Sequence, residues 1–313
     1  MKPRFTGHDT FPLRHGWLFK AIDLIKNKQL ISASDNEQAA RTIEILGVGK
    51  NMVNAIRYWA EVSKVVETRF DNRALVQEAT PFGNYLFDVE SGRDPYLEDI
   101  GTLWLLHFLL CFDDSQLTAY RYFFNYSNSI YFEKNKLVED LLEDLVRLTG
   151  SASVNQSTIK KDVDCFLATY AEKQRIGSKK KAVNEDHFAS PLTELGLVKD
   201  LGRGFFQCDL DERPSLPLNI FIYALAKFFE FSNSESSSRQ VSFEDVLSKP
   251  LSPGRIFRLS EADLGRCIDE AVSESHGAIV WVDSLGLKQV AIQESLLNNS
   301  SILLDDYYGA RNS

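Results

Sequence analysis

The residues best suited to chemistry lie in a short N-terminal stretch, residues 5–17. This stretch holds two of the five histidines together with an aspartate and an arginine. Histidine and aspartate can bind a divalent cation or move protons, and an arginine can hold a phosphate through its fork of donors. Such a set is suited to cleaving a phosphodiester bond with Mg²⁺ or Mn²⁺ as cofactor. The predicted catalytic residues are His8, Asp9, Arg14 and His15.

A structural role for the same stretch is the alternative. His8 and His15 are seven positions apart, a spacing that is compatible with several geometries and diagnostic of none. Asp9 and Arg14 could form a structural ion pair, or cap a helix that begins near Gly16. No phosphate-binding loop, dinucleotide fingerprint, hydrolase elbow or HExxH pair occurs in the sequence. Glu98 and Asp99 are expected to start a helix rather than to bind a metal ion. His107 is expected to be a core residue rather than a metal ligand.

A helix, a glycine turn and a second helix follow. Apolar residues recur at three- and four-residue spacing in residues 36–46, behind Ser34 or Asp35 as a cap. Gly47 and Gly49 suit a sharp turn between helices. The second helix has apolar residues on one side and basic or amide side chains on the other. Its polar face and flanks supply the predicted DNA contacts Lys50, Asn51, Asn54, Arg57 and Tyr58.

Two strand-like runs, residues 64–68 and 74–78, come next and are joined by a basic tip. Asp71-Asn72 is a good turn signal there, and Arg69 and Arg73 suit phosphate contacts. The order of helix, turn, helix and hairpin is that of a winged helix-turn-helix, whose second helix can enter the major groove. Winged helices also serve as protein-binding modules, so this alternative stays open.

The same pattern recurs twice. Residues 133–148 and a helix capped by Ser157 precede a hairpin at 197–201 and 205–210, and Ser260 caps residues 261–274 before a hairpin at 278–283 and 288–292. The basic segment 173–181 could contact DNA or be solvated. We predict a mainly α protein with small β-hairpins, an α+β fold of tandem winged helix-turn-helix-like modules. The expected domains are 1–92, 93–231 and 232–313.

Composition limits the possible partners and compartment. The net charge of −9 argues against wholesale coating of nucleic acid, although residues 1–87 carry 12 Lys/Arg against 9 Asp/Glu and permit local contact. The four cysteines are widely separated, which favours small apolar core residues over zinc or disulfides. The N-terminus lacks a signal peptide, and the most apolar run is too short to span a bilayer. We expect a cytoplasmic protein without membrane contact.

Five sequence blocks carry a resemblance to a known family. They are FTGHDTFPLRHGWLFKA at 5–21, LGVGKNMVNAIRYW at 46–59, DPYLEDIGTLWLLHFLL at 94–110, SPLTELGLV at 190–198 and SPGRIFRLSE at 252–261. Through these blocks, which span nearly the whole chain, the sequence resembles a bacterial family encoded beside genes for PAPS-reductase-like sulfur-transfer enzymes. The family includes the SspB-type components of the Ssp system, which places phosphorothioate in one DNA strand and serves in phage defence.

The resemblance implies binding of double-stranded DNA and, for the SspB type, nicking that opens the backbone for sulfur insertion. It also implies a PAPS-reductase-like sulfur-transfer protein and an ATPase as partners. It supplies no catalytic residues, so those predicted above rest on the sequence pattern alone. A metal-dependent nickase therefore competes with a non-catalytic winged-helix adaptor or transcriptional regulator, and with an adaptor that binds only proteins.

Overall fold

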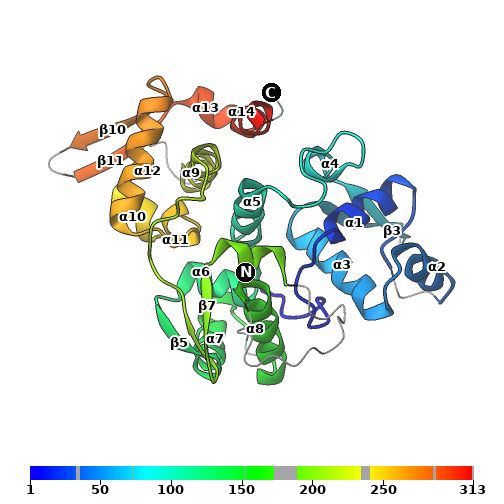
Figure 1. Ribbon diagram of the computed structural model, residues 1–313. Helices are drawn as coiled ribbons and strands as arrows, with labels where there is room; N and C mark the ends of the chain where they lie inside the picture. Colours follow the sequence, from blue (N-terminus) through cyan, green and yellow to red (C-terminus); the bar gives the residue numbers. More distant parts are fainter. Residues whose placement is uncertain are drawn as a thin grey trace, which may run out of the picture. The chain divides into compact units, whose positions relative to one another are not determined.

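The predicted fold class is confirmed: the chain is mainly α-helical with small β-sheets (Figure 1). The computed structural model describes residues 1–32, 36–72, 74–151, 153–172, 189–233, 240–284 and 287–311. Contacts divide the chain into two compact units. Unit 1 is Met1–Leu110, Ser115–Tyr120 and Tyr131–Cys208, and unit 2 is Cys111–Asp114, Arg121–Ile130 and Asp209–Ser313.

These units do not follow the expected domain boundaries at residues 92 and 231. The expected middle segment is shared, because most of it packs with the N-terminal residues while three parts pack with the C-terminal residues. Helix α6 (Ala119–Tyr126) gives its first two residues to unit 1 and the others to unit 2.

Unit 1 begins with three helices and a hairpin. Helix α3 buries its apolar side, and α1 packs against both α3 and α4. Gly47 has a φ of +64° between α2 and α3, the left-handed region that glycine adopts without strain. Thr80 caps α4 by accepting the N–H of Gly83 at 2.9 Å. The elements are α1 (Trp17–Lys26), α2 (Asn36–Leu46), α3 (Lys50–Val62), β2 (Val66–Asp71), β3 (Ala74–Ala79) and α4 (Pro81–Phe87).

The rest of unit 1 combines a buried helix with a second helix pair and a four-stranded sheet. Helix α5 is apolar on all sides and almost fully buried. Helices α7 and α8 pack together, and the sheet has the strand order β5-β8-β7-β6. The elements are β1 (Lys2–Pro3), α5 (Ile100–Cys111), β4 (Gln116–Leu117), β5 (Tyr131–Glu133), α7 (Lys134–Thr149), α8 (Gln156–Tyr170), β6 (Ala171–Glu172), the 3₁₀ helix η2 (Pro191–Leu195), β7 (Val198–Gly202) and β8 (Phe205–Gln207).

Unit 2 is built around α9, which packs against α11, α12, α13 and α14. A three-stranded antiparallel sheet of order β10-β11-β9 lies beside α12 and α10. Arg258 is buried, stacks on the Phe123 ring and donates to the carbonyl of Ser129 at 2.9 Å. The elements are α9 (Leu218–Asn233), β9 (Gln240–Ser242), α10 (Phe243–Ser248), α11 (Pro253–Ile256), α12 (Glu261–Glu274), β10 (Ile279–Ser284), β11 (Leu287–Ile292), α13 (Glu294–Asn298) and α14 (Ile302–Arg311).

Several local expectations can be compared with the structure. Ser260 caps α12, and the Asp99 carboxylate accepts the N–H of Gly101 at the start of α5, both as expected. The cap of α8 is Asn155 rather than Ser157, so this helix begins at Gln156, two residues earlier than predicted. His107 is a core residue 2.9 Å from the Tyr170 hydroxyl. All four cysteines are buried and free, which confirms their place in the core.

Some expectations fall outside the described residues. These are the caps Ser34 and Asp35 and the basic segment 173–181. Within the described part of the chain, no helix has the length and apolar character needed to cross a bilayer.

A loop carboxylate in unit 1 makes stability depend on pH. Asp88 is buried, forms an ion pair with Lys26 and accepts the Ser91 hydroxyl at 2.8 Å. The Lys26 bond, followed by the bonds from Ser91, holds the pKa of Asp88 well below its usual value near 3.8. A carboxyl with a depressed pKa stabilises the fold above its unfolded pKa, and this contribution is lost as pH falls through the folded pKa.

We therefore expect Asp88→Asn to destabilise the protein at pH 7 and to differ progressively less from the parent below about pH 4. Urea unfolding of both proteins at pH 7, 4 and 3 measures this convergence. The exposed Asp114→Asn is the control and should follow the parent throughout. A constant stability gap across the pH range would contradict the assignment.

Candidate nucleic-acid interface

The N-terminal loop that carries the predicted catalytic residues lies against helices α3 and α8 of unit 1. The indole N–H of Trp59 on α3 donates to the carbonyl of Phe11 at 3.0 Å, and the Cys165 thiol on α8 approaches the same oxygen at 3.4 Å. Arg4 forms an ion pair with Glu61 at the end of α3, at 2.5 Å. The loop is therefore attached to both helices through main-chain and side-chain bonds.

The loop takes an unusual backbone path. Gly7, Asp9 and Thr10 all have positive φ angles, of +111°, +45° and +64°. At Gly7 a Cβ atom would lie 2.9 Å from the Tyr58 ring, so a larger residue would displace the loop. Such conformations cost free energy in residues other than glycine, and they persist only where surrounding contacts hold them. The contacts with α3 and α8 provide that support.

His8 is buried, and both of its ring nitrogens face polar groups of the protein. Its Nδ1 accepts the N–H of Thr10 at 3.0 Å, and its Nε2 lies 3.0 Å from Oδ1 of Asp162, in the geometry of an ion pair rather than an aligned hydrogen bond. The Thr10 bond assigns the proton to Nε2, facing the carboxylate. In this conformation both nitrogens are buried, and His8 anchors the loop to Asp162 on α8.

Asp162 on α8 is the residue of this cluster that sequence reasoning missed. Its carboxylate is buried, and its second oxygen accepts the N–H of Ala119 at 2.6 Å. It therefore ties the loop to the start of α6 as well as to α8. The signal was present in the sequence, because Asp162 stands on the same helix face as the apolar Ile159 and Phe166. A carboxylate on such a face requires a buried partner.

Asp9 joins the predicted catalytic loop to the predicted DNA-reading helix. Its Oδ2 accepts the side-chain N–H of Asn54 on α3 at 3.0 Å, and its carboxylate is partly exposed. Two residues singled out separately in the sequence are thus in direct contact. Asp9 is the acidic group of the loop that solvent can reach.

Arg14 and His15 lie in different surroundings from His8. The Arg14 guanidinium stacks on the rings of Phe11 and Trp17, 5.5 Å from each centroid. The imidazole of His15 is about half exposed and lies 4.0 Å from a carboxylate oxygen of Glu194. Among the residues that the structure describes, no three His, Cys, Asp or Glu side chains converge as a set that could hold a metal ion.

The outer face of α3 carries most of the predicted DNA contacts. Lys50 and Asn51 are exposed, and Asn54 and Arg57 are half-buried. Tyr58 corrects the expectation, because it is only 2% exposed and its hydroxyl lies 3.3 Å from that of Tyr120. Burial raises its pKa well above the ordinary value. Nucleic acid cannot reach this ring while the helix stays packed.

The hairpin after α3 has a polar tip of mixed character. Arg69 pairs with Glu78 on the neighbouring strand through two bonds of 2.6 and 3.0 Å, which raise the pKa of its guanidinium. A phosphate would therefore have to compete with Glu78 for Arg69. Phe70, which the sequence reasoning did not single out, is 75% exposed beside it. Arg73 lies outside the described residues.

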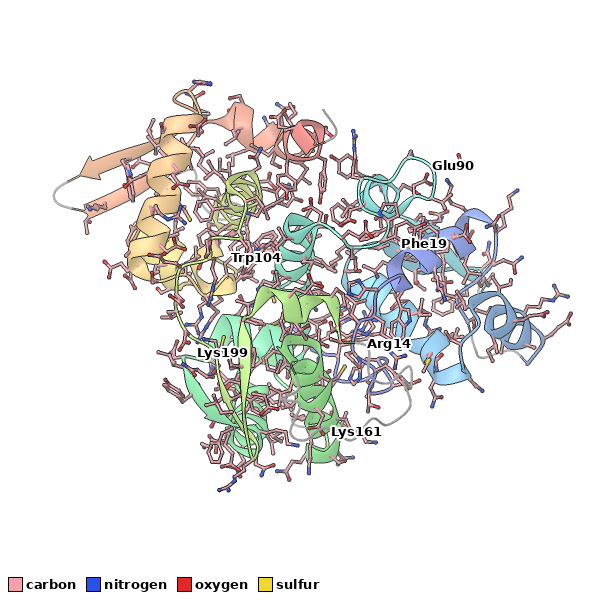
Figure 2. All side chains as sticks on the ribbon, in the orientation of Figure 1. Arg14, Phe19, Glu90, Trp104, Lys161 and Lys199 are labelled. Carbon is pink, nitrogen blue, oxygen red and sulfur yellow. The ribbon has the colours of Figure 1, made fainter. Side chains whose placement is uncertain are left out.

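Helix α8 adds cations that were not predicted. Lys160 and Lys161 are both exposed near its start, and Figure 2 labels Lys161. They lie on the same helix as Asp162, which contacts the loop from the opposite, buried side. The loop thus connects two helices of unit 1 that each present positive charge to solvent.

Comparisons with known proteins extend this description. The family model described as "Protein of unknown function (DUF4007)" matches residues 5–308. The chain is similar to a magnesium ion-bound SspB crystal structure, with a TM-score of 0.82 and 29% identity, and to another SspB crystal structure, with a TM-score of 0.83 and 28% identity. Each match covers 98% of this chain and 89% of the other. No curated protein matches the sequence.

The His8–Asp162 contact generates a stability prediction. Asp162→Ala would leave His8 and the N–H of Ala119 without their buried partner, which costs about 3 kcal/mol in the free energy of unfolding. The control is Asp164→Ala on the same helix, because its ion pair with Lys134 is partly exposed and contributes less than about 1 kcal/mol. Urea unfolding of the three proteins measures both losses. Equal losses in the two variants would contradict the anchoring role of Asp162.

Proposed function

Because this chain belongs to the DUF4007 family and shares its fold with SspB, we propose that it is the SspB-type DNA-binding subunit of a DNA phosphorothioation system. In this role it binds double-stranded DNA in the cytoplasm and contributes to phage defence. Its partners are a PAPS-reductase-like sulfur-transfer protein and an ATPase of the same system.

The exposed face of α3 is the observation that carries the DNA-binding proposal. Lys50 and Arg57 stand on one side of the helix, with the amides of Asn51 and Asn54 between them. Within the described part of the chain, neither cation has a carboxylate partner at ion-pair distance. Arginine and amide side chains are the groups that read base edges, while lysine suits phosphate. This face can therefore contact both base edges and phosphates.

The arrangement of neighbouring elements supports the same proposal. The chain passes from α2 through the Gly47 turn into α3 and then into the β2–β3 hairpin. We interpret this order as a winged helix-turn-helix, in which α3 enters the major groove and the hairpin reaches the backbone. The lysines at the start of α8 would extend the contact to further phosphates.

Strand nicking is the finer activity that we propose for this subunit. Asp9 is the residue placed to take part, since its partly exposed carboxylate adjoins Asn54 on the DNA-facing helix. Magnesium commonly binds one or two protein carboxylates and completes its coordination with water and substrate phosphates. Asp9 fits the protein side of such a site with Mg²⁺ or Mn²⁺, the metal supplying charge stabilisation at the phosphate. Arg14 and His15 would then be accessory residues.

A non-catalytic DNA-binding adaptor is the second candidate, and one observation favours it. His8, the histidine closest to Asp9 in sequence, is buried, with its Nδ1 bonded to the Thr10 N–H and its Nε2 beside Asp162. The loop then lacks a free general base at that position. In this alternative the loop positions α3, and a partner protein cuts the strand.

The DNA contact is tested with Lys50→Ala and Arg57→Ala, singly and together. Each loss of a phosphate contact should weaken binding to a duplex and reduce the slope of log K against log salt by about 1. Fluorescence anisotropy at several KCl concentrations measures affinity and slope. Lys249→Ala, which removes an exposed lysine of unit 2, is the control and should leave both unchanged. Parent-like slopes in the α3 variants would refute this interface.

The nicking activity is tested by converting supercoiled plasmid to open circles with Mg²⁺ or Mn²⁺. Asp9→Ala should abolish conversion while duplex affinity stays within about threefold, because the carboxylate belongs to the reaction rather than to the contact. Asp114→Ala serves as the control and should nick normally. If the pure parent protein binds DNA without nicking it, the adaptor function replaces the nickase.

A further inference from the structure

Unit 2 contains a groove whose chemistry differs from that of the α3 face. It lies between α12 and the β10–β11 hairpin and has a volume of about 1110 Å³. We call it the acidic groove. It is defined by the aromatic residues Phe243 and Trp281, the carboxylates Glu261, Asp269 and Glu270, and the cations Arg266 and Lys288.

The floor of the acidic groove is aromatic and held in place. The rings of Phe243 and Trp281 lie 5.9 Å apart at 39°, and both side chains are partly exposed. The indole N–H of Trp281 donates to Asp269 at 2.7 Å, which fixes the ring beside a carboxylate of the wall. An apolar side chain or a cation could therefore rest on a preformed aromatic surface.

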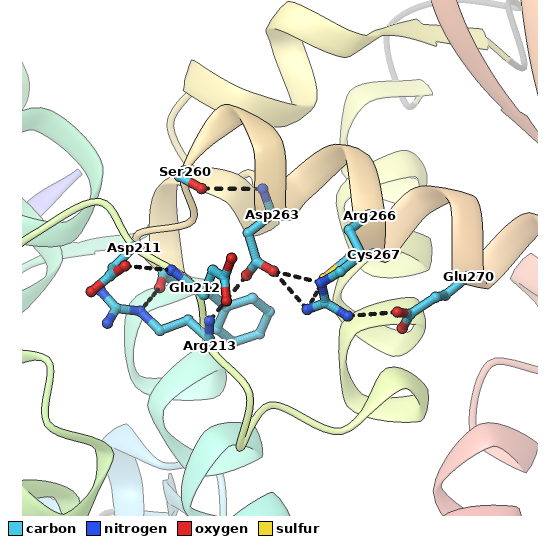
Figure 3. A network of polar contacts seen from close by, with 9 residues as sticks. Asp211, Glu212, Arg213, Ser260, Asp263, Arg266, Cys267 and Glu270 are labelled. Carbon is cyan, nitrogen blue, oxygen red and sulfur yellow. Dashed lines mark hydrogen bonds and ion pairs between the residues drawn. The ribbon is translucent and has the colours of Figure 1, made fainter.

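The cation of α12 is already used within the helix (Figure 3). Arg266 donates to Asp263 through Nε and Nη2, at 2.9 and 2.6 Å, and to Glu270 through Nη1 at 2.6 Å. Asp263 is buried and also accepts the N–H of Arg213 at 3.0 Å, so its position is fixed. Asp263, followed by Glu270, raises the pKa of Arg266. Its charge is thus balanced inside unit 2.

The remaining charge in the groove is negative. Because Glu270 already pairs with Arg266, the carboxylates left for a partner are Glu261 and Asp269, which are exposed along α12, and Lys288 stands across from them on β11. A helix with this face repels phosphates, in contrast to α3 with Lys50 and Arg57. The helix-and-hairpin arrangement is similar in the two places, but the acidic groove is complementary to positive charge.

We propose that the acidic groove binds a partner protein through a segment that carries lysine or arginine beside an apolar side chain. The carboxylates of α12 pair with the cations of the segment, and its apolar side chain packs on Phe243 and Trp281. This docking site is separate from the DNA contact proposed for unit 1, and it gives the subunit one surface for nucleic acid and another for protein.

The probe is a short fluorescein-labelled peptide of alternating lysine and leucine, titrated with the full chain and followed by anisotropy. A lysine-serine peptide and a glutamate-leucine peptide of the same length are the matched probes. The lysine-leucine peptide should bind with one-to-one stoichiometry, the lysine-serine peptide more weakly because it lacks apolar side chains, and the glutamate-leucine peptide not at all.

Two sets of variants assign the binding to the groove. Glu261→Gln with Asp269→Asn removes two charges but keeps an acceptor for Trp281, and should raise the peptide Kd by about fivefold or more. Glu90→Gln with Glu139→Gln removes two exposed charges elsewhere and should leave it unchanged. Phe243→Ala should weaken binding of the lysine-leucine peptide more than binding of the lysine-serine peptide. The charge variants keep the test valid should Phe243→Ala fail to fold.

Equal peptide affinity in the two double variants would overturn the proposal. So would a loss of duplex DNA binding in Glu261→Gln with Asp269→Asn at unchanged peptide affinity, which would assign the groove to nucleic acid. Duplex binding by the Lys50 and Arg57 variants is measured separately. A failure of the docking site is therefore distinguishable from a failure of the proposed DNA contact.

Discussion

The arrangement of unit 1 depends on one buried contact, that of His8 with Asp162. Taking a carboxylate and an imidazole out of water is costly unless each finds partners, and here Thr10 and Ala119 supply the additional hydrogen bonds. The contact brings together the N-terminus, α8 and the start of α6, which are far apart in sequence. It also holds the loop in the strained path that places Asp9 against Asn54. The proposed site thus depends on the buried contact that His8 makes with α8.

The two units use a similar order of helices and hairpins, but the exposed faces of α3 and α12 differ in the sign of their charge. Cations and amides face solvent on α3, and lysines on α8, whereas carboxylates line α12 and its arginine is balanced internally. Backbone architecture alone therefore does not decide which partner a helix binds; the side chains on the exposed face do. A net charge of −9 for the chain hides this division, since an average cannot describe two surfaces of different sign.

Elements whose determinants are local could be predicted from the sequence. The helices at α2, α3, α7 and α12, the hairpins after them, and the Thr80 and Ser260 caps follow from periodicity, turn residues and capping side chains. Contacts between distant segments could not be predicted in this way. Tyr58 looked like a flank of a polar face, but the loop covers it, and Asp162 looked unremarkable without its partner 154 positions earlier. Some residues of the candidate site could therefore be predicted from the sequence, but the contacts between them could not.

The interleaving of the two units constrains how such a protein can change during evolution. Unit 2 takes Cys111–Asp114 and Arg121–Ile130 from the middle of the chain, so neither unit corresponds to one continuous stretch of gene. Exchange of Asp209–Ser313 with another gene would separate these residues from the two middle segments that complete unit 2. A single exchange therefore cannot transfer unit 2 as a whole. The two units are thus inherited together, and one family model accordingly matches residues 5–308.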